Sequence, residues 1–108
     1  MVAIKQQLVK RTNRISTGKN LINYITIHET GNTGRGSNAQ AHANLQSNGN
    51  SREASWHYQV DDKQIIQSFP DTAICWHAGI GNAQSIGIEI CVNADGDFTK
   101  AVENAVAL

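Results

Sequence analysis

Residues 85–91 read Ser-Ile-Gly-Ile-Glu-Ile-Cys, and this stretch decides the fold. Isoleucine occupies every second position, and a period of two is typical of a β-strand with one apolar face. The isoleucines are therefore expected on one side of the strand, and Gly87, Glu89 and Cys91 on the other. The alternation continues to Val92 and makes this the strongest strand pattern in the chain.

Glu89 lies in the middle of this apolar strand. Burial of a charged carboxylate costs several kcal/mol unless the group is paired or protonated. One interpretation is functional: burial would raise the pKa of Glu89, so that it could accept a proton from water and pass it to a leaving amine. The other is structural, with Glu89 as the partner of a buried backbone donor or of an arginine such as Arg35 or Arg52.

Strand and helix patterns surround this strand on both sides. Further strands are predicted at 21–27, 56–60 and 64–69, and helices at 39–46 and from residue 101. Asn38 can cap the first helix, because its side chain can accept a hydrogen bond from the first turn. A turn at 61–63 joins the two middle strands into a hairpin. Residues 79–82 are expected to form a loop.

Three histidines lie on or beside the predicted strands. His28 follows the first strand on its polar face, His57 lies within the hairpin, and His77 precedes a loop. Each is either a ligand or substrate contact or a hydrogen-bonded core histidine, and the residues alone leave both readings open. Trp76, beside His77, fits a place in the core. His42, on the first helix, is expected in solvent.

Bulk properties limit the possible partners. The length of 108 residues fits one domain, and the formal net charge of zero gives no reason to expect nucleic-acid binding. Residues 1–20 are polar and basic, and we interpret them as an arm followed by a turn. The basic residues of this arm are Lys5, Lys10, Arg11, Arg14 and Lys19. They form either a solvated arm or a weak attraction for an anionic polymer.

The two cysteines, Cys75 and Cys91, are too few for a disulfide framework and are expected to be free buried thiols. A metal-ligand role remains an alternative for Cys91. The sequence shows neither a signal peptide nor an apolar run of membrane-spanning length, so we expect no membrane insertion. The glycines of the loop at 31–36 match neither the G-x-G-x-x-G spacing of dinucleotide-binding proteins nor the spacing of a P-loop. Nucleotide binding is therefore a weak hypothesis.

Four segments together resemble a known family. They are 25–30 (Ile-Thr-Ile-His-Glu-Thr), 55–62 (Ser-Trp-His-Tyr-Gln-Val-Asp-Asp), 76–79 (Trp-His-Ala-Gly) and 85–91. In this order they resemble the zinc-dependent N-acetylmuramoyl-L-alanine amidases of the type-2 amidase family, and most of all the catalytic domains of phage and prophage endolysins. The resemblance covers residues 21–108 and implies an α/β fold with a central mixed β-sheet flanked by helices, as in peptidoglycan-recognition proteins.

The resemblance also implies a site and a reaction. It makes His28 the first ligand of a Zn²⁺ ion and Glu89 the catalytic carboxylate, and it places Trp56, His57 and His77 around the substrate groove. The reaction would be hydrolysis of the amide between N-acetylmuramic acid and L-alanine of the peptidoglycan stem peptide. The remaining zinc ligands are expected beyond residue 108, which indicates an incomplete amidase domain at 21–108 and an incomplete zinc site.

The alternative function is a non-catalytic peptidoglycan-binding module or an inactive amidase fragment. In either case the expected partner is peptidoglycan, with no nucleic acid and no membrane insertion. Self-association is expected through apolar surface left exposed. The protein would be made in the cytoplasm and would act on the cell wall after release or holin-assisted export.

Overall fold

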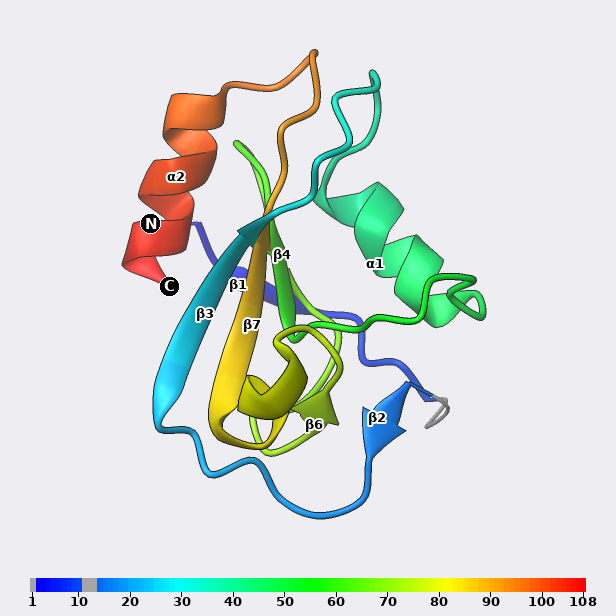
Figure 1. Cartoon of the computed structure of the whole chain (residues 1–108). Coiled ribbons are helices and arrows are strands. Elements are labelled where there is room, and N and C mark those ends of the chain that lie inside the picture. The colour runs from blue at the N-terminus through cyan, green and yellow to red at the C-terminus, as the bar shows by residue number, and fades with distance from the viewer. Residues whose placement is uncertain (1, 11–13) are drawn as a thin grey trace.

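The computed structural model describes residues 2–10 and 14–108, and Figure 1 shows a mixed sheet with one helix against each face. The sheet has five strands in the order β1-β5-β4-β7-β3. Their bounds are Ile4–Gln6 for β1, Ile65–Gln67 for β5, Tyr58–Val60 for β4, Ser85–Ile90 for β7 and Tyr24–Glu29 for β3. The β3–β7, β4–β7 and β1–β5 pairs are parallel and the β4–β5 hairpin is antiparallel, which confirms the predicted mixed sheet.

Two small cores lie on opposite faces of this sheet. On one face, Ile88 and Ile90 of β7 pack with neighbouring strand residues against Ala101 and Ala105 of α2 (Phe98–Ala107). On the other face, α1 (Ala39–Ser47) brings Ala39 and Ala43 against the sheet. The period of two therefore has the predicted consequence: the isoleucine face of β7 meets α2, and its other face remains available for polar residues.

Both helices begin at capping side chains. The Asn38 side chain accepts a hydrogen bond from the backbone N–H of Ala41, as the sequence predicted. Asp97 does the same for the N–H of Lys100, so α2 begins at Phe98 and not near residue 101 as expected. Residues 79–84, expected in part as a loop, form a short 3₁₀ helix, η1 (Gly79–Gln84).

The arm predicted at residues 1–20 contains two strands that the sequence analysis missed. β1 extends the sheet beside β5, and β2 (Ile15–Ser16) pairs antiparallel with β6 (Ile74–Cys75). Every residue of β1 is exposed, and backbone hydrogen bonds hold this edge strand in the sheet. Its sequence therefore shows no alternation of apolar and polar residues from which a strand could be predicted. Arg11, one of the basic residues of the expected arm, lies outside the described residues.

β3 is the edge strand at the other end of the sheet. Its apolar residues Ile25 and Ile27 are 63% and 54% exposed, whereas Thr26 and His28 are half-buried. Strand alternation therefore turns His28 toward the interior side of β3. We call the exposed set at this edge the β3 ridge; its members are Leu21, Ile22, Tyr24, Ile25 and Ile27.

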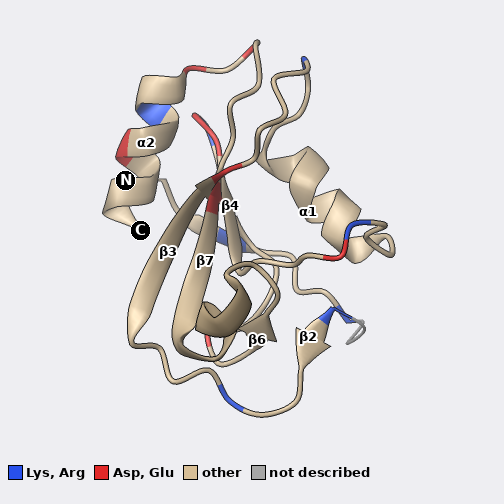
Figure 2. Ribbon diagram, viewed as in Figure 1, with Lys and Arg blue, Asp and Glu red and all other residues tan. Residues whose placement is uncertain are grey.

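Charged groups do not gather on one side of the molecule. In Figure 2, basic and acidic segments are scattered over loops, strands and α2, and α1 carries neither, in keeping with the formal net charge of zero. None of the helices in the described part of the chain has the length and apolar character needed to cross a membrane.

Candidate active site

The register of the parallel strands brings Glu89 and His28 together. His28 of β3 stands directly opposite Glu89 of β7, and Gln59 of β4 stands opposite Glu89 on its other side. Paired residues in neighbouring strands project from the same face, so all three lie on the face away from α2. Two residues that are 61 positions apart in the sequence thus become neighbours.

His77 completes a pair of imidazoles with His28. Nε2 of His28 lies 3.2 Å from Nδ1 of His77, and the two rings meet edge to face with centroids 5.4 Å apart. His77 comes from the segment after β6 and lies over Gly87 of β7. A Cβ atom at Gly87 would lie 2.7 Å from Cγ of His77, so only glycine leaves room for this ring.

The contacts of Ser85 favour one arrangement of protons on this pair. The Ser85 hydroxyl donates to the carbonyl of Gly81 at 2.9 Å, and Ser85 Oγ lies 3.4 Å from Nε2 of His77. Since the hydroxyl proton is engaged, Ser85 Oγ accepts from Nε2–H of His77, and Nδ1 of His77 is the acceptor for Nε2–H of His28. This tautomer chain leaves Nδ1 of His28 as the nitrogen with a free lone pair.

Burial favours the neutral form of both imidazoles. Desolvation by burial, together with the neighbouring His57 and His28, lowers the pKa of His77 to about 4, although a hydrogen bond from the ring to the backbone of Ser85 acts in the opposite direction. Burial also lowers the pKa of His28. A neutral ring has one donor and one acceptor nitrogen, which the tautomer chain requires.

Glu89 has the properties of a proton-transfer group. The residue is 7% exposed, and its Oε2 atom has no hydrogen-bond partner among the described residues. Burial raises the pKa of Glu89 to about 7, although the positive charge of Arg52 acts in the opposite direction. A carboxyl group with a pKa near neutrality can both accept and return a proton, and such shifted groups concentrate at functional sites.

His57 and Trp56, both expected around a substrate groove, lie inside the fold. His57 is fully buried; its Nε2 donates to the carbonyl of Ala73 at 2.8 Å, and its Nδ1 accepts from the N–H of Gly87 at 2.9 Å. Trp56 is 1% exposed and donates from Nε1 to Gln59 at 2.7 Å. The ring N–H groups of both side chains thus donate to acceptors within the chain, and a substrate contact by either stays a prediction.

Two further expectations concern His42 and Cys91, which lie between α1 and the sheet. His42, expected in solvent, is 4% exposed, because it shares the inward helix face with Ala39, Ala43 and Gln46. The spacing of these four residues, i, i+3, i+4 and i+7, was the signal that could have revealed this. Cys91 lies 3.9 Å from His42 as a free, buried thiol, as predicted, and burial raises its pKa to about 12.

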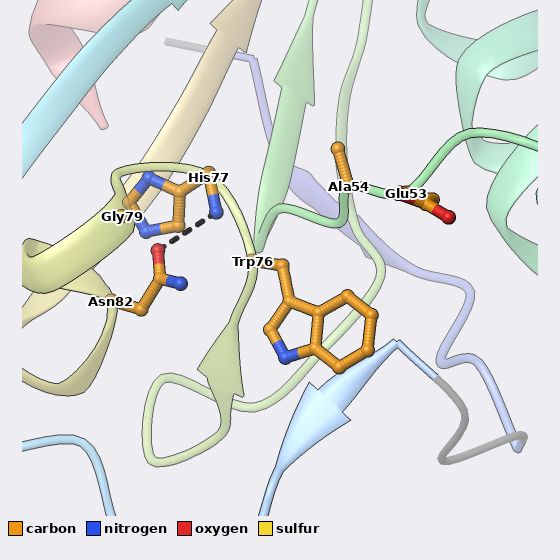
Figure 3. Close-up of a pocket in the computed structure, with 6 residues that line it drawn as sticks. All are labelled: Glu53, Ala54, Trp76, His77, Gly79 and Asn82. Carbon is orange, nitrogen blue, oxygen red and sulfur yellow. Dashed lines mark hydrogen bonds between the residues drawn. The ribbon is translucent and has the colours of Figure 1, made fainter.

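A pocket of about 420 Å³ opens beside His77 (Figure 3). Its lining residues are Glu53, Ala54, Trp76, His77, Gly79 and Asn82. Trp76 is half-buried, and its Nε1 donates to Ser16 Oγ at 3.0 Å, which fixes the ring at the pocket wall. The place of Trp76 at a pocket was missed in the sequence, where an aromatic residue beside His77 fitted the core equally well.

The described residues form no group of three or more His, Cys, Asp or Glu side chains able to hold a metal ion. Catalytic zinc sites use three protein ligands. Residues 2–10 and 14–108 therefore do not complete such a site by themselves.

The glycine-rich loop at 31–36 does not have the form of a phosphate cradle. The N–H of Gly36 donates to the carboxylate of Asp95 at 2.9 Å. A carboxylate at this donor would repel a phosphate group, and the hydrogen bonds to Gly36 and Asn93 lower the pKa of Asp95 and keep it charged.

The mixed sheet defines an α/β fold, and on one face of this sheet a buried carboxylate lies beside a pair of imidazoles, groups suited to acid–base chemistry. The chain belongs to the N-acetylmuramoyl-L-alanine amidase family, whose sequence profile matches residues 18–108. The resemblance seen in the four sequence segments is thus confirmed.

Individual relatives support this membership. The chain is 47% identical over 111 residues to the N-acetylmuramoyl-L-alanine amidase CwlH of Bacillus subtilis (strain 168), covering 97% of this chain and 44% of CwlH. It is 52% identical over 86 residues to the amidase XlyA of the same organism, covering 76% of this chain and 29% of XlyA. The chain thus spans less than half the length of these curated relatives.

Solved structures agree with the fold. The catalytic domain of XlyA superposes with a TM-score of 0.87 at 44% identity, over 96% of this chain and 71% of that structure. A mutant endolysin from Bacillus subtilis gives the same TM-score, 0.87, at 46% identity, over 97% of this chain and 71% of that structure.

Proposed function

We propose that this chain contributes the catalytic carboxylate of a peptidoglycan amidase, which hydrolyses the amide between N-acetylmuramic acid and L-alanine of the stem peptide. The observation that carries this proposal is the pairing of Glu89, buried and without a partner for Oε2 in the described part of the chain, with His28 on the next strand. The names of the relatives support the reaction and the substrate.

In this proposal Glu89 moves the protons of the reaction. Its carboxylate takes a proton from a water molecule, and the water oxygen bonds to the carbonyl carbon of the scissile amide. The protonated Glu89 then donates this proton to the amide nitrogen as the carbon–nitrogen bond breaks, which releases a carboxylic acid and the free amine of L-alanine. A pKa of about 7 suits both directions of transfer at neutral pH.

Zinc dependence is part of the proposal on the strength of the family resemblance. When bound, zinc would polarise the scissile carbonyl and acidify water. His28 is the ligand that this chain would supply. Its Nδ1 keeps a lone pair in the tautomer chain, while Nε2–H donates to His77, as metal-bound histidines commonly donate their other ring N–H.

The proposal is tested on purified peptidoglycan by measuring release of free L-alanine amino groups. Glu89→Gln should abolish release while the variant still binds the wall, and Glu103→Gln on α2, which removes an equal charge far from the site, should not change it. Addition of a chelator should also stop release, and elemental analysis of the folded protein gives its zinc content. Unchanged release after both the chelator and Glu89→Gln would refute the amidase proposal.

A second candidate is a wall-binding module without catalysis, favoured by the lack of a three-ligand group in the described residues. Retention of the chain on purified peptidoglycan with no release of peptide would support it. Action on the cell wall after release from the cell, with peptidoglycan as the partner, belongs to both candidates.

A further inference from the structure

Glu89 is a buried carboxyl group whose polar neighbours leave it without a hydrogen bond. Oε2 of Glu89 has no partner among the described residues, although Gln59 of β4 stands beside it on one side and His28 of β3 on the other. Both neighbours carry N–H groups, and a buried acceptor without a donor costs free energy. Some feature of the fold therefore keeps these N–H groups away from Oε2.

The side-chain amide of Gln59 leans away from Glu89. In the register of the sheet, Gln59 faces Glu89 of β7 on one side and Ile66 of β5 on the other. Its Nε2 donates to the carbonyl of Ile66 and to Ser68 Oγ, each at 2.8 Å. Both amide protons are thus used on the β5 side of the strand, and neither is left for Glu89.

The amide oxygen of Gln59 is engaged as well. Its Oε1 accepts from Nε1 of Trp56 at 2.7 Å and from Nε2 of Gln46 at 3.1 Å. Gln46 lies on the inward face of α1 and is itself fixed, because its amide exchanges hydrogen bonds with the backbone N–H and carbonyl of Trp56, both at 3.1 Å. All four hydrogen-bonding positions of the Gln59 amide are therefore occupied.

The partners determine which end of the amide is oxygen and which is nitrogen. An indole N–H can only donate, so the atom of Gln59 that meets Trp56 is the oxygen. A backbone carbonyl can only accept, so the atom that meets Ile66 is the nitrogen. We call the four side chains that form these bonds the Gln59 network; its members, Gln46, Trp56, Gln59 and Ser68, are at most 2% exposed. Burial keeps bulk water from replacing a bond that is lost.

The other possible donors near Glu89 are also directed elsewhere. The Nε2–H group of His28 points to His77. The guanidinium group of Arg52 lies 5.1 Å from the centroid of the Trp56 ring, and its positive charge acts on Glu89 without a hydrogen bond to Oε2. Trp56 thus holds two neighbours of Glu89, one with its ring N–H and one with its ring face.

We propose that Gln59 is a positioning residue for Glu89: the network holds its amide turned toward β5, so that Oε2 stays free for the attacking water. This inference rests on the proposed function, in which Glu89 takes a proton from water. A carboxylate that accepts an amide N–H bond is a weaker base, because the bond stabilises its charged form. By withholding this bond, the Gln59 network preserves the basicity of Glu89.

Hydrogen exchange of the Gln59 side chain tests the arrangement in the unmodified chain. Both protons on Nε2 are bonded and buried, so NMR should show them exchanging far more slowly than those of an exposed glutamine such as Gln64. Exchange at the rate of Gln64 would overturn the proposal, and this outcome needs no variant.

Ser68→Ala tests the consequence for Glu89. The variant removes one acceptor of the amide, and the freed N–H of Gln59 should turn across β4 to Oε2 of Glu89, the buried acceptor that lacks a donor. A crystal structure of the variant shows whether the amide has crossed. With a soluble muramyl peptide as substrate, we expect kcat to fall about tenfold while KM stays nearly constant, because a hydrogen bond to a charged group is among the stronger ones.

Two further variants separate positioning from stability. Ser68→Thr keeps the hydroxyl acceptor and should restore the kcat of the parent. Asn104→Ala removes a hydrogen bond to the Asp61 carbonyl, so it should lower the free energy of unfolding without changing kcat. If the Gln59 amide stays on the β5 side in Ser68→Ala and kcat is unchanged, the positioning role is overturned.

Failure of this role can be distinguished from failure of the amidase proposal. The exchange rates and the crystal structure report the position of the Gln59 amide whether or not the chain cleaves its substrate. An active parent chain whose amide does not cross in Ser68→Ala refutes the positioning role alone. An amide that crosses in a chain without activity supports the hold of Ser68 on Gln59 and counts against the amidase proposal.

Discussion

Nε2 of His28 and Nδ1 of His77 lie 3.2 Å apart, and this contact orders the protons of the site. His77 has its other nitrogen beside Ser85, so it serves as the acceptor for His28. The consequence for His28 is a defined tautomer with Nδ1 unprotonated. A site that needs a lone pair on His28 thus has it prepared by a residue from a different segment of the chain.

Nitrogen-detected NMR at pH 7 checks this arrangement. We expect His28 and His77 both to carry their proton on Nε2, with a downfield, slowly exchanging Nε2–H signal for His28. His77→Phe keeps an aromatic ring but removes the acceptor, so this signal should move upfield and exchange fast. Trp76→Phe, which alters a neighbouring ring, should leave it in place. A proton on Nδ1 of His28 in the unmodified chain would contradict the tautomer chain.

Gly87→Ala tests how closely His77 packs on β7. The added Cβ would lie 2.7 Å from Cγ of His77, so the ring must move. We expect a loss of about 1–3 kcal/mol in the free energy of unfolding, as for other overpacked positions, measured by urea denaturation. Gly81→Ala is the matched control, since its Cβ would meet Ala78 at 3.4 Å, an ordinary contact. Equal losses for both variants would show that His77 does not fill the space above Gly87.

The pKa of Glu89 predicts a specific pH dependence of stability. Burial raises this pKa from 4.5 to about 7, so between these values the folded chain binds more protons than the unfolded chain, and stability falls as pH rises. Glu89→Gln cannot ionise and should be more stable than the parent at pH 8 by about 3 kcal/mol, with little difference at pH 4. Denaturation midpoints from pH 4 to 8 measure this, with Glu103→Gln as the control. A constant difference across this range would mean that the pKa of Glu89 is not raised.

The sequence predicted those parts of the fold that depend on local pattern. The isoleucine alternation at 85–91, the Asn38 cap and the β4–β5 hairpin each follow from neighbouring residues, and all are present. β1 and β2 were missed because they are short edge strands whose side chains are mostly exposed, and the backbone bonds that form them come from residues far along the chain.

The same distinction applies to the site. Glu89 stood out in the sequence because burial of a charged carboxylate among isoleucines costs free energy in any fold. The His28–Glu89 pairing needed the parallel register, and the burial of His57 depends on Ala73 and Gly87, which come from later segments of the chain. The pocket at Trp76 could not be predicted, since Glu53 lies in a loop and Asn82 in the short 3₁₀ helix η1, and neither segment has a periodic pattern.

The β3 ridge predicts self-association. Its five apolar side chains are between 43% and 69% exposed; three lie on the edge strand that ends the sheet, and Leu21 and Ile22 lie just before it. An exposed apolar edge strand is a template for pairing with another chain. We expect light scattering to show a concentration-dependent rise in mass for the parent chain. The double variant Ile25→Thr/Ile27→Thr keeps β-branched residues and should shift the chain to monomer, whereas Ile80→Thr, at a fully exposed position on η1, should not. A parent chain that stays monomeric at all concentrations would show that the ridge does not drive association.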